Sequence, residues 1–196
     1  MQRLSRDEVI SVVEPYSEQL YSIGAEPFAE YMEKYPNLAI HSTRTRANII
    51  WDLMVNRVHR EFRGVSSTKI IVTRNGVVLL IVAEKVCIRF KKLNMGGFPS
   101  NFPTPAAINW DRGEDLPGIP SAPQRLSLGY KLNRLQTAVV EVQITNVLNG
   151  RYVYGITLEA PSEGLIVLDS RDSATSTEAT PKRRVFIRPS EEQSEM

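Results

Sequence analysis

In the first part of the chain, apolar residues recur every three or four positions, which predicts an amphipathic helix. Ser5 and Glu8 form the signature of a capping box at its start. Pro15 lies within the periodic run and predicts a kink or a break, and Gly24 predicts the helix end. A second, shorter helix is expected over Pro27–Tyr35, with its aromatic residues in the core.

A third helix is predicted between Ser42, as its cap, and Gly64, as its end. One face is apolar, and a second row combines Leu53 with several arginines. A helix that is apolar on more than one side is expected to be largely enclosed. The arginines are then candidates for ion pairs with the acidic N-terminal helices as well as for ligand contacts.

From Thr68 onward the apolar pattern changes to a period of two, which is typical of strands. Asn75-Gly76 and Asn149-Gly150 each lie between two such runs and predict tight hairpins. The fold class expected is therefore α+β, with N-terminal helices packed on an antiparallel sheet built from two Asn-Gly hairpins. The strands are predicted over these ranges: Lys69–Arg74, Val77–Ala83, Val86–Leu93, Arg125–Arg134, Thr137–Leu148 and Arg151–Glu159.

The remaining segments differ in composition. Residues 94–124 are rich in proline and are expected to form a long connection, with a short helix from Thr104 to Trp110. After Asp169 the chain consists mostly of small, polar and charged residues that cannot form a core. We therefore expect one α+β domain over residues 1–169 and a disordered tail over 170–196.

Composition restricts the classes of protein to consider. The chain has 196 residues, 42% of them hydrophobic, which suffices for one core. Cys87 is the single cysteine, so no intrachain disulfide can form and a reducing cytoplasm fits best. The longest apolar run, Val77–Ala83, is too short to cross a bilayer. No apolar segment of a signal peptide follows Met1. The expectation is a cytoplasmic protein without membrane contact.

Charge is distributed unevenly along the chain. Residues 40–93 contain eleven basic and three acidic residues, a net charge of +8, whereas the whole chain carries +2. Such clustering is typical of a surface that binds nucleic acid. The alternative is that this segment neutralises residues 1–39, which carry −4. The candidate nucleic-acid-binding residues are Arg44, Arg46, Arg57, Arg60, Arg63, Arg89, Lys91 and Lys92.

Signatures of catalysis are weak. His41 and His59 lie in neither an HExxH nor a C-x-x-C pattern, and no phosphate-binding glycine loop is present. We therefore assign no catalytic residue, no metal site and no cofactor. Cations near Cys87 on its predicted strand would lower its pKa, although a lone cysteine is usually a packing residue. Glu141 and Gln143 on a predicted strand leave a metal-dependent nuclease as an alternative, with Asp111 and Asp115 upstream.

Four segments resemble a group of small bacterial and phage proteins that are encoded beside ImmA/IrrE-type metallopeptidases. These segments are His41–Ala47, Arg89–Leu93, Leu116–Pro120 and Gly129-Tyr130. The resemblance covers about residues 40–160 and supplies no catalytic residues. It implies a prokaryotic protein associated with phage or other mobile elements, and with defence or stress regulation.

The function expected from the sequence is a non-enzymatic regulatory or defence-associated binding protein. It would contact nucleic acid through the basic helix-plus-hairpin segment. One alternative is a protein–protein adaptor or antitoxin-like partner, in which the same surface or the basic Lys182–Arg188 island meets an acidic protein. A protein partner is expected in either case. The metal-dependent nuclease is the second alternative.

Overall fold

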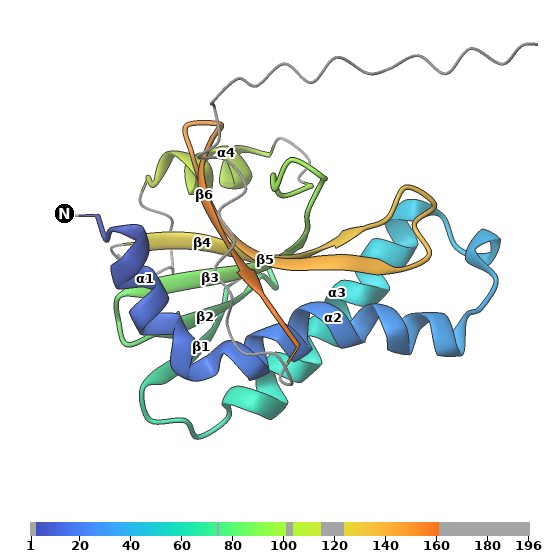
Figure 1. Cartoon of the computed structure of the whole chain (residues 1–196), viewed down its shortest axis with the longest axis horizontal. Coiled ribbons are helices and arrows are strands. Elements are labelled where there is room, and N and C mark those ends of the chain that lie inside the picture. Colours follow the sequence, from blue (N-terminus) through green and yellow to red (C-terminus); the bar gives the residue numbers. More distant parts are fainter. Residues whose placement is uncertain (1–2, 74, 101–103, 115–123, 161–196) are drawn as a thin grey trace, which may run out of the picture.

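The structure is a computed structural model that describes residues 3–73, 75–100, 104–114 and 124–160. Helices and strands form layers, with α4 on one face of the strands, at the top of Figure 1, and with α1, α2 and α3 packed on the other face. The helices have these bounds: α1 Arg6–Val13, η1 Glu14–Tyr16, α2 Ser17–Lys34, η2 Leu38–Ile40, α3 Thr43–Phe62 and α4 Pro105–Arg112.

The strands form one six-stranded sheet in the order β1-β2-β3-β4-β5-β6. An α+β fold is therefore confirmed, with a sheet that is mostly antiparallel. The strands have these bounds: β1 Thr68–Val72, β2 Val78–Val82, β3 Val86–Lys92, β4 Gln124–Leu132, β5 Val139–Leu148 and β6 Arg151–Leu158.

One strand pairing differs from the prediction of an antiparallel sheet. β3 and β4 are parallel, with Val86 opposite Gln124 and Lys92 opposite Tyr130. A parallel pair requires a crossover of a dozen or more residues. The long connection that contains α4 is this crossover, and it returns the chain to the end of the sheet where β3 begins. The proline-rich segment therefore sets the sheet topology.

The N-terminal helices show both confirmed and incorrect predictions. Ser5 and Glu8 make the reciprocal capping box of α1. Pro15 lies in the short 3₁₀ turn that separates α1 from α2, so the predicted break is confirmed. The predicted stop at Gly24 is wrong, because α2 continues through Gly24 and Pro27 to Lys34. An added Cβ at Gly24 would lie 2.3 Å from Cγ1 of Val142, so this glycine allows the helix to approach β5 closely.

The main core lies between the sheet and the helices. α3 begins after its cap Ser42 and contributes Ile50, Met54 and Val58, all buried. Together with residues of α1 and α2, these side chains pack on the inward positions of the strands, including Ile88 and Leu128. Burial of such a face is the main driving force for this layer arrangement.

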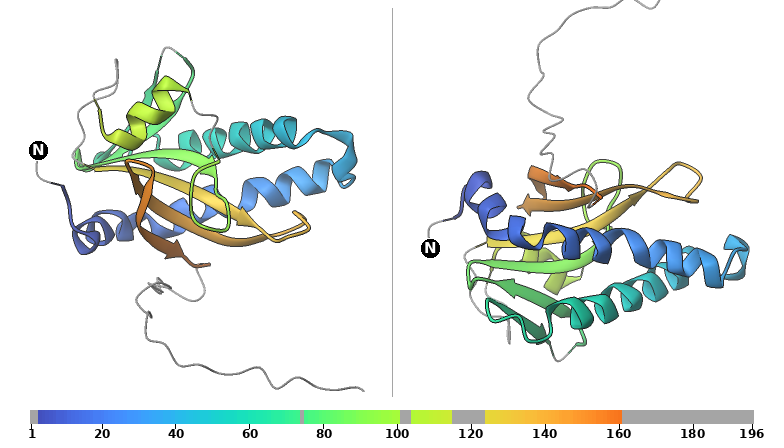
Figure 2. Two further views of the ribbon diagram at one scale, coloured as in Figure 1. Left: turned by 90° about the horizontal axis from the view of Figure 1, so that it is seen from above. Right: turned by 60° about the horizontal axis from the view of Figure 1, so that its bottom comes forward.

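The opposite face of the sheet has a smaller apolar cluster. Trp110 of α4 packs against Leu79, Ile81 and Cys87. α4 is capped by Thr104, whose hydroxyl accepts from the backbone N–H of Ala107, so the predicted short helix is confirmed. Figure 2 shows α4 on the side of the sheet away from α2 and α3. The same face also carries Arg89, Lys91 and Ser127.

Consecutive strands are antiparallel neighbours at both edges of the sheet. Asn75 and Gly76 lie in the five-residue connection between β1 and β2, whose last residue pair is Val72 with Val78, and Asn149 and Gly150 lie between β5 and β6. Asn149 and Gly150 have φ of 50° and 72°, the left-handed conformation that a two-residue hairpin turn requires. The predicted tail over 170–196 and its Lys182–Arg188 island lie outside the described residues. Within the described ranges, no helix combines the length and apolarity needed to span a membrane.

Candidate functional site

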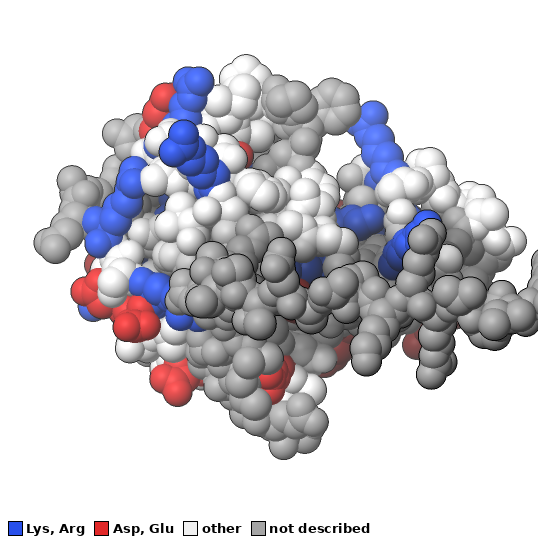
Figure 3. Space-filling model, turned by 45° about the horizontal axis from the view of Figure 1, so that its top comes forward, with Lys and Arg blue, Asp and Glu red and all other residues white. Residues whose placement is uncertain are grey.

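The eight basic residues expected to bind nucleic acid lie in three separate places. Arg57, Arg60 and Arg63 lie toward the C-terminal end of α3 or just beyond it, and Arg89 and Lys91 lie on the α4 side of β3. The third group, at the N-terminal end of α3 and the end of β3, contains Arg44, Arg46 and Lys92. Figure 3 shows Lys and Arg in several separate groups on the face that it presents. The eight residues therefore do not form one surface.

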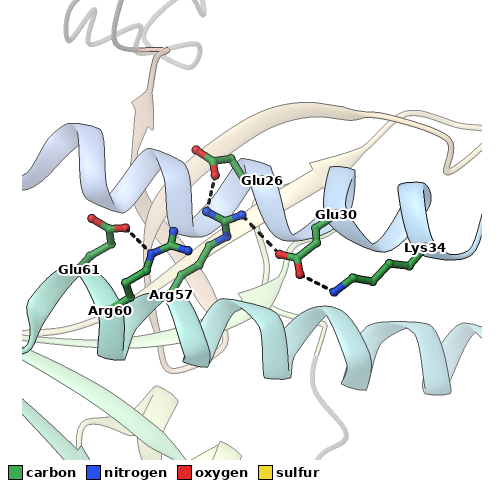
Figure 4. Close-up of polar contacts among 6 residues, drawn as sticks. All are labelled: Glu26, Glu30, Lys34, Arg57, Arg60 and Glu61. Atoms are coloured by element: carbon green, nitrogen blue, oxygen red, sulfur yellow. Dashed lines mark hydrogen bonds and ion pairs between the residues drawn. The ribbon is translucent and has the colours of Figure 1, made fainter.

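The Arg57 side chain pairs with acidic side chains of α2, as Figure 4 shows. Its guanidinium pairs with the carboxylates of Glu26 and Glu30, at 3.4 Å for Glu30. Glu30 also accepts from Lys34 at 2.8 Å, and this hydrogen bond is the main cause of its lowered pKa, with Arg57 contributing less. The Arg57 side chain is 12% exposed. Arg57 therefore joins α2 to α3 by charge.

The other two arginines of this group are more accessible. Arg60 is exposed and pairs with its neighbour Glu61 at 3.1 Å. Arg63 follows the last residue of α3 and is also exposed. An exposed pair of adjacent residues contributes little to stability, so both positions tolerate substitution without loss of the fold.

Arg89 is the most enclosed of the eight, at 4% exposed. It donates to Ser127 Oγ at 2.8 Å and pairs with Asp111 of α4 at 2.7 Å. Its guanidinium also lies over the Trp110 ring, 5.0 Å from the centroid. Burial lowers the pKa of Arg89 to about 10, although Asp111 opposes the shift. Arg89 therefore holds α4 onto the sheet and does not reach a ligand.

Lys91 and Cys87 share that side of β3 with Arg89. Lys91 is half-buried, and its pKa is lowered by burial and by the charge of Arg89. Burial raises the pKa of Cys87 to about 12, which outweighs the opposite effect of Arg125 and Arg89. The nearby cations therefore do not lower the pKa of Cys87 below its ordinary value, and Cys87 packs beside Trp110, in keeping with the prediction of a packing residue.

The third group has a different arrangement. Arg46, 7% exposed, donates from Nη2 to Oε1 of Gln136 at 2.6 Å. Lys92 donates from Nζ to the same oxygen at 3.2 Å. Gln136 lies in the turn between β4 and β5, so three distant parts of the chain meet here. Two cations therefore share one neutral acceptor.

No carboxylate balances this pair among the residues with described positions. The ion pairs there include neither Arg46 nor Lys92. Burial lowers the pKa of Lys92, and the charge of Arg46 lowers it further. The two positive charges thus repel one another at a partly buried site, where an uncompensated charge is energetically unfavourable. An anion placed here would relieve both effects.

Two further arginines lie close in the sequence to residues of this site, Arg44 two positions before Arg46 and Arg134 two positions before Gln136. Arg44 is exposed in the first turn of α3, and Arg134 is exposed in the same turn as Gln136. We call Arg44, Arg46, Lys92 and Arg134 the basic end. Arg134 lies outside the basic 40–93 segment, so its membership depends on the pairing of β4 with β5 and was not visible in the sequence.

Two carboxylates of the alternative nuclease site are each paired with a different basic residue. Glu141 pairs with Lys131 at 2.7 Å and accepts from Thr157 at 2.8 Å, whereas Asp111 is held by Arg89. Asp115 lies outside the described residues. Across the described ranges, no group of three His, Cys, Asp or Glu could hold a metal ion. Gln143 is buried, and its Oε1 has no hydrogen-bond partner among the residues that the structure describes.

A cavity of about 360 Å³ lies between α2 and the strands β5 and β6. Its lining includes Tyr21 of α2 and two carboxylates, Glu141 and Glu159, together with apolar residues of both strands. Within the described ranges, no basic side chain lines it. Its charge is therefore the opposite of that at the basic end, and it does not suit an anion.

Comparison of the chain with protein-family models, with curated proteins and with solved structures finds no match.

Proposed function

We propose that this protein is a non-enzymatic regulatory or defence-associated binding protein that contacts the phosphates of nucleic acid through the basic end. The observation that carries the proposal is the convergence of Arg46 and Lys92 on one amide oxygen without a neutralising carboxylate among the described residues. The resemblance of residues 40–160 to proteins of mobile elements supports a role in regulation or defence.

The free energy of burying a positive charge is central at the basic end. Removing a cation from water is unfavourable unless a negative group compensates it. Arg57 and Arg89 have such groups in Glu26 and Asp111, but Arg46 and Lys92 have none among the described residues. A phosphate oxygen supplies the missing charge and accepts charge-assisted hydrogen bonds, which are stronger than those of an amide.

The four cations have different roles in this proposal. Arg44 and Arg134 are exposed and Lys92 is half-buried, so these three reach a phosphate directly. Arg46 lies below the surface and adds positive potential while it orients Gln136. In this proposal, the N-terminal helices and the sheet with its two Asn-Gly hairpins form the scaffold, while the N-terminal end of α3, the end of β3 and the turn between β4 and β5 bring these residues together.

Binding of this kind depends on the charge of the phosphates and does not distinguish base sequences. Phosphate contacts carry no base information, and affinity arises from release of condensed counterions. With a small number of contacts, we expect a dissociation constant of about 10⁻⁴ to 10⁻⁶ M at physiological salt. The affinity should fall steeply as salt rises.

The test is a fluorescence anisotropy titration of a labelled DNA duplex at two salt concentrations. Arg44→Glu/Arg134→Glu should reduce affinity by roughly tenfold or more per lost contact at 50 mM salt, because each contact releases counterions. Arg60→Glu/Arg63→Glu is the matched control, since it changes the net charge equally at the other end of α3. The control should bind nearly as wild type does.

Three outcomes would contradict the proposal. These are an equal loss in both double variants, no binding by wild type at low salt, or stronger binding to poly-glutamate than to DNA. The last result would favour an acidic protein partner, which uses the same cations. Circular dichroism of each variant separates loss of binding from loss of the fold.

A further inference from the structure

The turn between β4 and β5 presents an apolar side chain to solvent. Leu135 is 77% exposed, the highest value among the large apolar residues of the described ranges. It lies between Arg134, a member of the basic end, and Gln136, the acceptor of Arg46 and Lys92. The turn lies at the same end of the molecule as the connection between α2 and α3 (Figures 1 and 2).

Hydrogen bonds within the turn fix its shape. Asn133 Oδ1 accepts from the backbone N–H of Thr137, and Asn133 Nδ2 donates to Thr137 Oγ1, both at 2.9 Å. The backbone N–H of Gln136 donates to the carbonyl of Asn133 at 2.9 Å. Gln136 itself has φ of 56°, a conformation uncommon for residues other than glycine. Leu135 is therefore held outward by an ordered turn.

We propose that Leu135 is a wedge that inserts between stacked base pairs of duplex DNA bound at the basic end. This inference rests on the proposed function. Proteins that bind the minor groove often insert Leu, Ile, Met, Phe or Pro between base steps, while neighbouring cations contact the backbone. Arg134, next to Leu135 in the turn, and Lys92, which donates to Gln136, would contact phosphates beside the opened step.

The geometry favours duplex DNA for two reasons. An aliphatic side chain gains little by stacking on a free base, for which aromatic residues are the usual partners. It gains more by filling the space opened when a base step unstacks, because both faces of that space are apolar. Pyrimidine–purine steps such as TA unstack most easily, so insertion should occur there first.

The experiment uses one DNA duplex with a central TA step, carrying 2-aminopurine at that step and a dye at one end. Dye anisotropy reports binding, and 2-aminopurine emission reports unstacking. Wild type should raise both signals. Leu135→Ala should keep the affinity within about threefold, because the phosphate contacts remain, and should lose the rise in emission. Leu135→Met should retain it, because methionine also serves as a wedge.

Ile40→Ala is the matched control, since Ile40 is an exposed aliphatic residue at 59% in η2, at the same end of the molecule. It should behave as wild type does in both signals. Binding without a rise in emission, an equal rise with Leu135→Ala, or binding to single strands alone would overturn the wedge and leave phosphate binding intact. Absence of any anisotropy change at low salt would instead reject the proposed function.

Discussion

Arg46 and Arg57 lie on nearly the same face of α3, about three turns apart, yet their surroundings differ in charge. Arg57 lies between two carboxylates of α2. Arg46 lies beside another cation and a neutral amide. Two residues of one type on one helix therefore have opposite electrostatic roles, because the elements that pack against each end differ.

This difference shows why the net charge of a segment does not define a binding surface. The +8 of residues 40–93 includes charges already neutralised, such as Arg57 and Arg89. What remains for a ligand is the part without acidic partners. A structural arginine should contribute stability, whereas a ligand-binding arginine should cost some of it.

The largest effect is expected on removing the charge of Arg57. Arg57→Met keeps the aliphatic packing, removes the partner of Glu26 and leaves Glu30 paired with Lys34 alone among the described residues. A fully buried pair would cost more, but both carboxylates are partly exposed. We expect the free energy of unfolding to fall by about 2 kcal/mol, between the values for exposed and buried pairs. Urea denaturation measures this change.

A double-mutant cycle with Glu26→Gln/Glu30→Gln provides the control. If the pair accounts for the loss, Arg57→Met should cost much less in that background. An equal cost in both backgrounds would show that packing of the side chain, and not its charge, stabilises the α2–α3 contact.

The opposite result is expected at Arg46. Arg46→Met removes a buried cation that has no acidic partner among the described residues, and it relieves the repulsion with Lys92. The free energy of unfolding should change by less than about 1 kcal/mol or increase, because replacing a buried charge by an apolar side chain is often neutral or stabilising. The affinity for DNA should fall in the same variant. A loss of stability as large as that of Arg57→Met would remove the contrast.

The sequence predicted the local structure well and the long-range arrangement less well. Capping residues and the change of apolar period gave most helices and strands, because these signals act over a few residues. Gly24 was interpreted as a helix end, since its contact with Val142 of β5 depends on tertiary packing. The parallel pairing of β3 with β4 depends on how a long connection folds, which no local pattern encodes.

The candidate site shows the same limit. Arg44, Arg46 and Lys92 were identified from the sequence, but so were five residues that lie elsewhere in the fold. Arg134 and Gln136 were missed because they reach the site through the β4–β5 turn. Which arginine finds a carboxylate is decided by packing between elements, so composition alone could not separate Arg46 from Arg57.

A smaller effect should appear at low pH. The pKa of Glu30 lies below its ordinary value of 4.5, mainly through the hydrogen bond from Lys34. A carboxyl whose pKa is lowered by folding stabilises the fold above the unfolded pKa, and this contribution is lost as pH falls through the folded pKa. Glu30→Gln should therefore flatten the loss of stability below pH 4.5. Thermal midpoints measured across that pH range test this prediction. An equal loss of stability with falling pH in wild type and in Glu30→Gln would contradict it.

The smallest effect concerns Lys92. Its lowered pKa destabilises the fold, whereas the lowered pKa of Glu30 stabilises it. Burial and the charge of Arg46 lower the pKa of Lys92 from its ordinary value of 10.5. The unfolded chain then holds this proton more tightly than the folded chain does. The penalty on folding is complete below the folded pKa and is relieved as pH rises toward 10.5. Stability in that window should rise relative to Lys92→Met.

A direct measurement of the Lys92 pKa joins this prediction to the proposed anion site. Nuclear magnetic resonance of the lysine Cε carbons, assigned with Lys92→Met, reports the titration of this group. Arg46→Met should raise the pKa of Lys92, because the second-largest cause of its shift is removed. Inorganic tripolyphosphate should also raise it in wild type, because a bound anion favours the charged amine. If the anion leaves the pKa unchanged while Arg46→Met raises it, the two cations repel one another without forming an anion site, and the contrast with Arg57 would be one of stability alone.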